Sequence, residues 1–135
     1  CEVKRVSPVF YIAGEGFSGI SKRLKAWKKE NENEFDGSDI PFFTSNMAME
    51  ALNKQSAKSV KEANCELSVE HGNPGLVVID TLARNFGPGD ENSTEDMSRF
   101  VRVIDFDIKA HFGCTVLIII TRDFLPKAVP GGTMR

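Results

Sequence analysis

Residues 75–105, GLVVIDTLARNFGPGDENSTEDMSRFVRVID, decide the fold class of this chain. The stretch begins with a continuous apolar run at 76–79, which predicts a strand that is buried on both faces. It continues into a helical pattern that Ser93 is placed to cap. One side of that helix carries Met97, Phe100, Val101, Ile104 and Ile108. A buried strand followed by an amphipathic helix indicates an α/β architecture.

The same alternation continues outward from this stretch in both directions. Three further apolar runs, 9–13, 40–44 and 115–120, are rich in β-branched or aromatic residues and predict strands. Helical patterns lie between them, with apolar stripes of Ile20, Leu24 and Trp27 and of Val60, Ala63 and Leu67. We expect Trp27 to lie in the core. The order of elements predicts a layered α/β fold with a mostly parallel sheet of about four strands. The 135 residues fit a single domain, without a repeat or a linker.

Composition and charge exclude several classes of protein. The chain is 41% hydrophobic and 27% charged, as globular proteins are, and its net charge of −2 gives no field toward nucleic acid or a membrane. The longest apolar run, 116–120, is too short to span a bilayer, so we expect no membrane partner. Three widely spaced cysteines without a CxxC pair argue against a disulfide framework and an ordinary zinc site. We therefore expect a reducing, cytoplasmic location.

Acids and hydroxyls follow the predicted strands. Glu15 comes after the first strand between two glycines, Asp80 and Thr81 come after the third, and Thr121 follows the last. In an open parallel sheet, ligands collect beyond the carboxyl ends of the strands. One carboxylate would hold a hydrated Mg²⁺ and the other would orient a water for attack on a phosphate. The alternatives are that Asp80 only caps a helix or turn and that Glu15 is an exposed loop acid.

Four segments taken together resemble the RepA-type replicative helicase ATPases, a RecA-like branch of the P-loop NTPases. They are FYIAGEGFSGISKRLKAW at 10–27, IPFFTSN at 40–46, the stretch at 75–105 and GCTVLIII at 113–120. The resemblance covers about residues 8–120. It implies a RecA-like three-layer fold and ATP hydrolysis that drives a DNA helicase, with ATP and Mg²⁺ as cofactors.

The resemblance also implies roles for single residues. LVVID at 76–80 corresponds to the Walker B strand, so Asp80 and Thr81 would bind Mg²⁺ through water. Glu15 matches the glutamate that activates water in RecA-like ATPases, and it is the expected catalytic residue. Arg84 and Asn85, in the loop after the Walker B strand, are accessory candidates. DNA as a partner is implied by the resemblance, but the net charge does not support it.

The sequence departs from the family pattern at the phosphate-binding loop. No GxxxxGK[ST] motif occurs in the 135 residues, so the nucleotide-binding residues stay unassigned and we expect a sheet that is incomplete at one edge. The first hypothesis is a truncated ATPase with little or no hydrolysis alone. One alternative is a nucleotide-binding ATPase completed by a separate P-loop segment. Another is a non-catalytic assembly module.

The C-terminal residues 121–135 are atypical of the family, which continues with two histidines and Thr-Gly. A codon string that encodes residues 119–132 reads HHTGFSSQGRARG when it is started two bases later, so we hypothesise a frameshifted tail. The uncharged run 116–120 would then lie at a sheet edge whose partner strand is missing. Such an edge invites pairing with another chain, and we expect a homo-oligomer, a dimer or larger. The alternative is a monomer in which the tail covers the edge.

Overall fold

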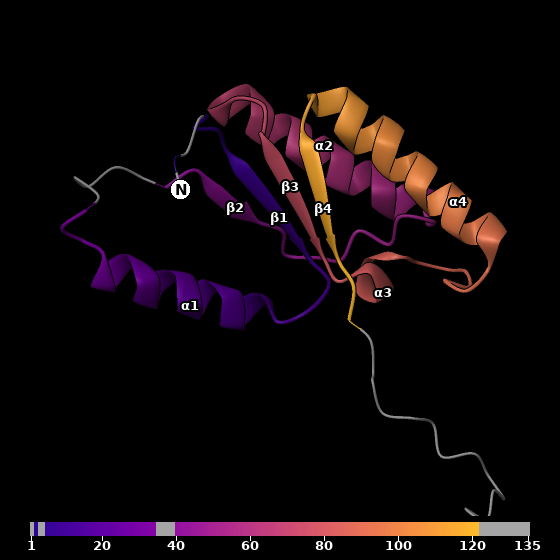
Figure 1. Cartoon of the computed structure of the whole chain (residues 1–135), viewed down its shortest axis with the longest axis horizontal. Coiled ribbons are helices and arrows are strands. Elements are labelled where there is room, and N and C mark those ends of the chain that lie inside the picture. Colours follow the sequence, from indigo (N-terminus) through magenta and orange to yellow (C-terminus); the bar gives the residue numbers. More distant parts are fainter. Residues whose placement is uncertain (1, 3–4, 35–39, 122–135) are drawn as a thin grey trace, which may run out of the picture.

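The computed structural model describes residues 2, 5–34 and 40–121 and shows an α/β fold around a parallel sheet (Figure 1). The strands are β1 (Val9–Ala13), β2 (Phe42–Thr44), β3 (Leu76–Asp80) and β4 (Thr115–Ile119). Their order is β2-β1-β3-β4, and every pair is parallel. The predicted α/β class and four-stranded parallel sheet are confirmed, and the arrangement is consistent with a RecA-like three-layer fold.

The helices lie on both sides of this sheet. They are α1 (Phe17–Glu30), α2 (Lys54–His71), the single turn α3 (Leu82–Asn85) and α4 (Thr94–Val103), which continues into a π-helical segment (Ile104–Ala110). Figure 1 shows α2 and α4 on one side of the sheet and α1 on the other. No helix in the described part of the chain is both long enough and apolar enough to cross a membrane.

The main core lies between the sheet and the layer formed by α2 and α4. Alternate strand residues point to it, among them Phe10, Ile12, Val77 and Ile79, which are all buried. Phe100 from α4 is fully buried in the same cluster and stacks on the ring of another phenylalanine with centroids 5.2 Å apart. The core therefore packs one face of the sheet tightly against α2 and α4. The other face is the one that lies toward α1 (Figure 1).

The ends of the elements follow local side-chain chemistry. The Ser93 hydroxyl accepts a hydrogen bond from the backbone N–H of Asp96 at 3.3 Å, which confirms Ser93 as the cap of α4. The second strand is shorter than predicted and starts at Phe42, while the third extends to Asp80. Val101, on the predicted apolar side of this helix, is exposed, because it lies one position past Phe100 and turns away from the sheet.

Helix α1 packs more loosely than its apolar stripe suggests. None of its residues is buried, and Trp27 is 45% exposed, so the prediction that Trp27 lies in the core is wrong. The reason is that the stripe faces a pocket rather than a tightly packed face. Apart from the exposed Thr121, the atypical tail lies outside the described residues. Residues 35–39, which come between α1 and β2 in the sequence, also lie outside the described residues.

Candidate functional site

The two predicted acids, Glu15 and Asp80, line one pocket of about 680 Å³ between the sheet and α1. Asp80 is the last residue of β3, and the parallel register pairs it with Ala13 at the end of β1. Glu15 follows two residues later, so the chain brings both carboxylates to the same edge of the sheet. The lining is completed by Tyr11, Gly16, Ile20, Arg23, Leu24, Trp27, Phe42 and Thr81.

A tyrosine that the sequence analysis missed holds the Asp80 carboxylate. The Tyr11 hydroxyl donates a hydrogen bond to Oδ2 of Asp80. Burial raises the pKa of Tyr11 to about 12, helped by the hydrogen bond and the negative charge of Asp80, while Arg23 acts in the opposite direction. Tyr11 therefore stays protonated at neutral pH. Its position two residues before the end of a predicted strand is the signal that would have placed it on the face of Ala13.

Thr81 also lines the pocket, and its hydroxyl does not cap the helix that follows. It is the residue before α3, yet its side chain makes no capping hydrogen bond. The backbone N–H of Gly14 donates to the Asp80 carbonyl at 2.7 Å, which locks the end of β1 to the end of β3. The peptide bond between Asp80 and Thr81 is cis. Asp80 and the hydroxyl-bearing Thr81 both line the pocket.

Glu15 forms an ion pair with Arg84, one of the two accessory candidates. The distance from Nη2 of Arg84 to Oε2 of Glu15 is 3.0 Å, and the two side chains are 60% and 63% exposed. Gly14 makes this approach feasible, because a Cβ at Gly14 would collide with Cβ of Arg84. Gly16 on the other side of Glu15 has φ 70°, a conformation that favours glycine. The two glycines therefore fix the turn that presents Glu15, while Arg84 itself does not line the pocket.

Asn85, the other accessory candidate, lies in the interior instead of the pocket. Its side chain is 0% exposed. Its Oδ1 accepts a hydrogen bond from the backbone N–H of Met49 at 2.9 Å, and its Nδ2 donates to the Thr81 carbonyl at 2.9 Å. Asn85 therefore fixes the backbone of Thr81 and does not reach a ligand in this pocket. Thr121, expected at the same edge, is not among the lining residues either.

The donor set of the pocket fits a hydrated Mg²⁺ better than a fully protein-coordinated ion. Asp80 and Glu15 offer carboxylate oxygens and Thr81 offers a hydroxyl. The described residues hold no group of three or more His, Cys, Asp or Glu side chains arranged around an ion. Mg²⁺ usually keeps several waters and takes one or two carboxylates together with substrate phosphates. The residues present fit that pattern, and Arg23 is the cation that lines the pocket in the described part of the chain.

Comparison with known proteins gives the family of the chain. The model of a family described as AAA domain matches residues 2–120, which is most of the 135-residue sequence. The chain matched none of the curated proteins or solved structures with which it was compared. The match covers the four strands and both pocket acids, and AAA-type families are P-loop NTPases that use a nucleotide and Mg²⁺. The chain belongs to the AAA domain family.

Proposed function

We propose that this chain carries the metal-binding and water-activating half of a RepA-type helicase ATPase, and that these 135 residues alone hydrolyse little or no ATP. One observation carries the proposal: Glu15, two residues after β1, and Asp80, the last residue of the neighbouring β3, line the same pocket together with Thr81. A pocket at the carboxyl ends of parallel strands is where α/β folds bind ligands. The family match supports a nucleotide as this ligand.

Each side chain has a separate task in this proposal. Asp80 would hold Mg²⁺ through water with help from the Thr81 hydroxyl, and the bound ion would neutralise charge on the phosphates. Tyr11 keeps the Asp80 carboxylate oriented. Glu15 would orient the attacking water, since a carboxylate at this position can accept a proton or hydrogen bond from it. Arg84 holds Glu15 in place through their ion pair.

The proposed site lacks the groups that bind the phosphates of a nucleotide in P-loop NTPases. The sequence contains no GxxxxGK[ST] motif, whose backbone N–H groups and lysine would cradle a triphosphate. Two carboxylates in the same pocket repel that anion, and Arg23 is the cation that lines it in the described residues. We therefore expect weak ATP binding by these residues alone. A second segment that contributes a P-loop would complete the site, and this is the alternative function.

Titration with ATP and Mg²⁺ tests the proposal. Trp27 is the only tryptophan and lines the pocket, so its fluorescence reports occupancy while calorimetry measures affinity. We expect no micromolar affinity and no release of phosphate above the buffer rate. Micromolar affinity with turnover would overturn the proposal in favour of the completed ATPase. In that case Glu15→Gln should abolish turnover and spare binding, while the exposed Glu34→Gln should change neither.

A second candidate function, assembly of several copies, is favoured by the edge of the sheet. Among the described strands β4 pairs only with β3, and Leu117 in it is 52% exposed. The strand carries no charge or proline that would block pairing of its free edge. We propose that two or more copies associate through β4. DNA contact by this chain and a cytoplasmic location stay predictions.

A further inference from the structure

A second pocket, of about 350 Å³, lies on the other face of the sheet, between α2 and the strands β1 and β2. It lies on the α2 side of the sheet, which faces away from α1 and the candidate ATPase site (Figure 1), and Tyr11 is the one residue that lines both pockets. Its walls are mostly apolar and include Phe10, Phe43, Val60 and Leu67. The volume lies at the small end of the range for ligand pockets, roughly 300–1,000 Å³, which suits a molecule of one or two rings.

One residue that lines this pocket has a side-chain hydrogen-bond donor without a partner. Asn64, in the middle of α2, lines the pocket although only 6% of the residue is exposed. Its Nδ2 is buried and has no hydrogen-bond partner. Buried amide groups are nearly always satisfied, since leaving a donor unpaired in the interior destabilises the fold. Because Asn64 lines the pocket, a rotation of its amide group would bring this donor to an acceptor atom on a ligand there.

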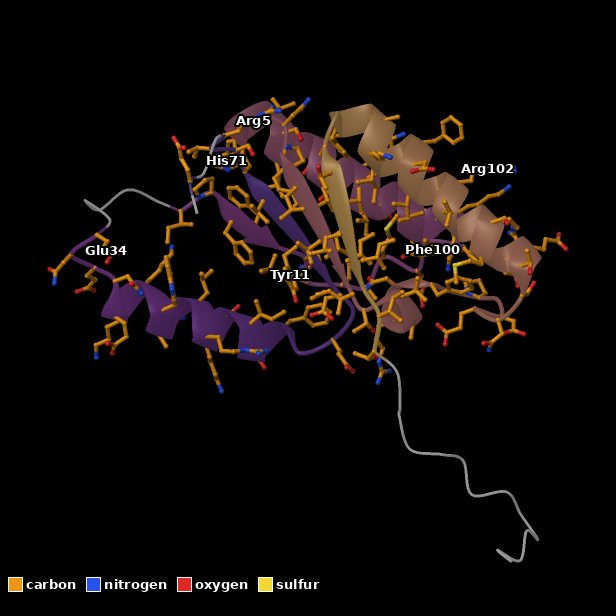
Figure 2. All side chains as sticks on the ribbon, viewed as in Figure 1. Arg5, Tyr11, Glu34, His71, Phe100 and Arg102 are labelled. Carbon is orange, nitrogen blue, oxygen red and sulfur yellow. The ribbon has the colours of Figure 1, made fainter. Side chains whose placement is uncertain are left out.

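The lining also defines the charge and shape of such a ligand. The lining contains no Asp, Glu, Lys, Arg or His, and its one tyrosine, Tyr11, donates its hydroxyl hydrogen bond to Asp80. A charged ligand would lose its hydration here without gaining a counter-charge. The ring of Phe43 is fixed between Phe10, at a centroid distance of 5.8 Å, and His71, at 4.4 Å. Figure 2 shows His71 at the end of α2 that lies beside the sheet. This fixed aromatic wall favours a flat ring.

We infer that the pocket between α2, β1 and β2 binds a small, neutral, one- or two-ring aromatic molecule whose hydrogen-bond acceptor is met by Asn64. The inference stands apart from the proposed ATPase function, since Tyr11 is the only residue common to the two linings. Phe43 and Leu67 would contact the ring. The hydrogen bond from the Asn64 amide would make a ligand with a carbonyl or ring nitrogen bind more tightly than a hydrocarbon of the same shape. The polar Ser59 and Asn46 in the lining leave the mouth accessible to water.

A pair of probes that differ by one acceptor tests this inference. 1-Indanone carries a carbonyl and indane lacks it, and binding of each to the ¹⁵N-labelled chain is followed by amide chemical shifts. We expect 1-indanone to bind about tenfold more tightly than indane, the value of one hydrogen bond to a buried donor. Asn64→Leu, which keeps the volume but removes the donor, should erase that preference and leave indane affinity within about twofold.

Matched variants separate this pocket from the rest of the surface. Ala63→Trp should fill the mouth of the pocket and abolish the binding of both probes. Val69→Ala, on an exposed position of the same helix, and Leu24→Ala, in the lining of the other pocket, should leave the affinity for both probes unchanged. The inference is overturned if neither probe binds at millimolar concentration, or if Asn64→Leu keeps the preference for 1-indanone. Loss of binding in Leu24→Ala would mean that the probes bind in the first pocket, and it would overturn the inference as well.

Discussion

The Tyr11 hydroxyl donates a hydrogen bond to the Asp80 carboxylate across the neighbouring strands β1 and β3. The register pairs Tyr11 with Val78, two residues before Asp80, so both side chains lie on the same face of the sheet. Figure 2 shows Tyr11 on the side of the sheet that faces α1. The carboxylate proposed to hold Mg²⁺ is therefore oriented by a neutral donor that carries no charge to compete with the ion.

The titration of Tyr11 tests this contact directly, because Tyr11 is the only tyrosine in the chain. We expect a pKa of about 12 in the absorbance of tyrosinate at 295 nm, above the ordinary value of 10.0. The pKa of Tyr11 is higher in the folded state than the ordinary value of 10.0, first through burial and then through Asp80, so the stability linked to protonated Tyr11 is fully present below pH 10. The contribution is lost as the pH rises from 10 to 12.

Replacing the acceptor should shift that titration. Asp80→Asn removes the charge and the carboxylate acceptor, so the pKa of Tyr11 should fall toward 10 but stay above it, because burial is the largest cause of the shift. Asp107→Asn, which alters an ion pair with Lys61 on another element, is the control and should leave the titration unchanged. A wild-type pKa near 10, or an unchanged value in Asp80→Asn, would contradict the hydrogen bond.

Truncation of Asn85 should destabilise the fold strongly. Asn85→Ala leaves the Met49 N–H and the Thr81 carbonyl without their buried partner, and we expect a loss of about 2–4 kcal/mol in the free energy of unfolding. Urea denaturation measures it. Asn46→Ala, at an exposed position, should stay within about 0.5 kcal/mol. A loss below about 1 kcal/mol for Asn85→Ala would show that its hydrogen bonds do not fix Thr81.

The ion pair between Arg84 and Glu15 should contribute little to stability. Both side chains are more than half exposed, and such pairs are worth about 0–1 kcal/mol. A double-mutant cycle with Arg84→Ala and Glu15→Gln in urea denaturation gives the coupling energy, which should shrink further at high salt. Coupling above about 2 kcal/mol would mean that the pair is far better shielded from water than the structure shows.

If copies of the chain associate through β4, a single charge added to this strand should separate them. Leu117→Lys places a cation on the exposed part of the free edge strand and should convert the assembly to a monomer in light scattering. Leu117 is a better target than Ile118, which packs against the core. Val69→Lys adds the same charge at an exposed position of α2 and should leave the mass unchanged. A wild-type monomer at high concentration would refute pairing through this edge.

Much of the fold could be predicted because strands buried on both faces read as continuous apolar runs. Glu15 and Asp80 could be predicted because ligands bind beyond the carboxyl ends of parallel strands, and the structure brings both residues into one pocket. Tyr11 was missed because its contact with Asp80 depends on the register between two strands that lie far apart in the sequence. Trp27 was misplaced because helical periodicity shows which side is apolar, but not how far the helix stands from the sheet.

The central claim is that Asp80 holds the metal ion of a nucleotide site, and paramagnetic broadening by Mn²⁺ tests it most directly. Mn²⁺ takes the oxygen ligands that suit Mg²⁺ and broadens nearby amide resonances. We predict that millimolar Mn²⁺ broadens the amides of Asp80, Thr81 and Gly16 first, and that Asp80→Asn removes this effect while Asp107→Asn preserves it. Broadening centred on other acids, or unchanged in Asp80→Asn, would contradict the account.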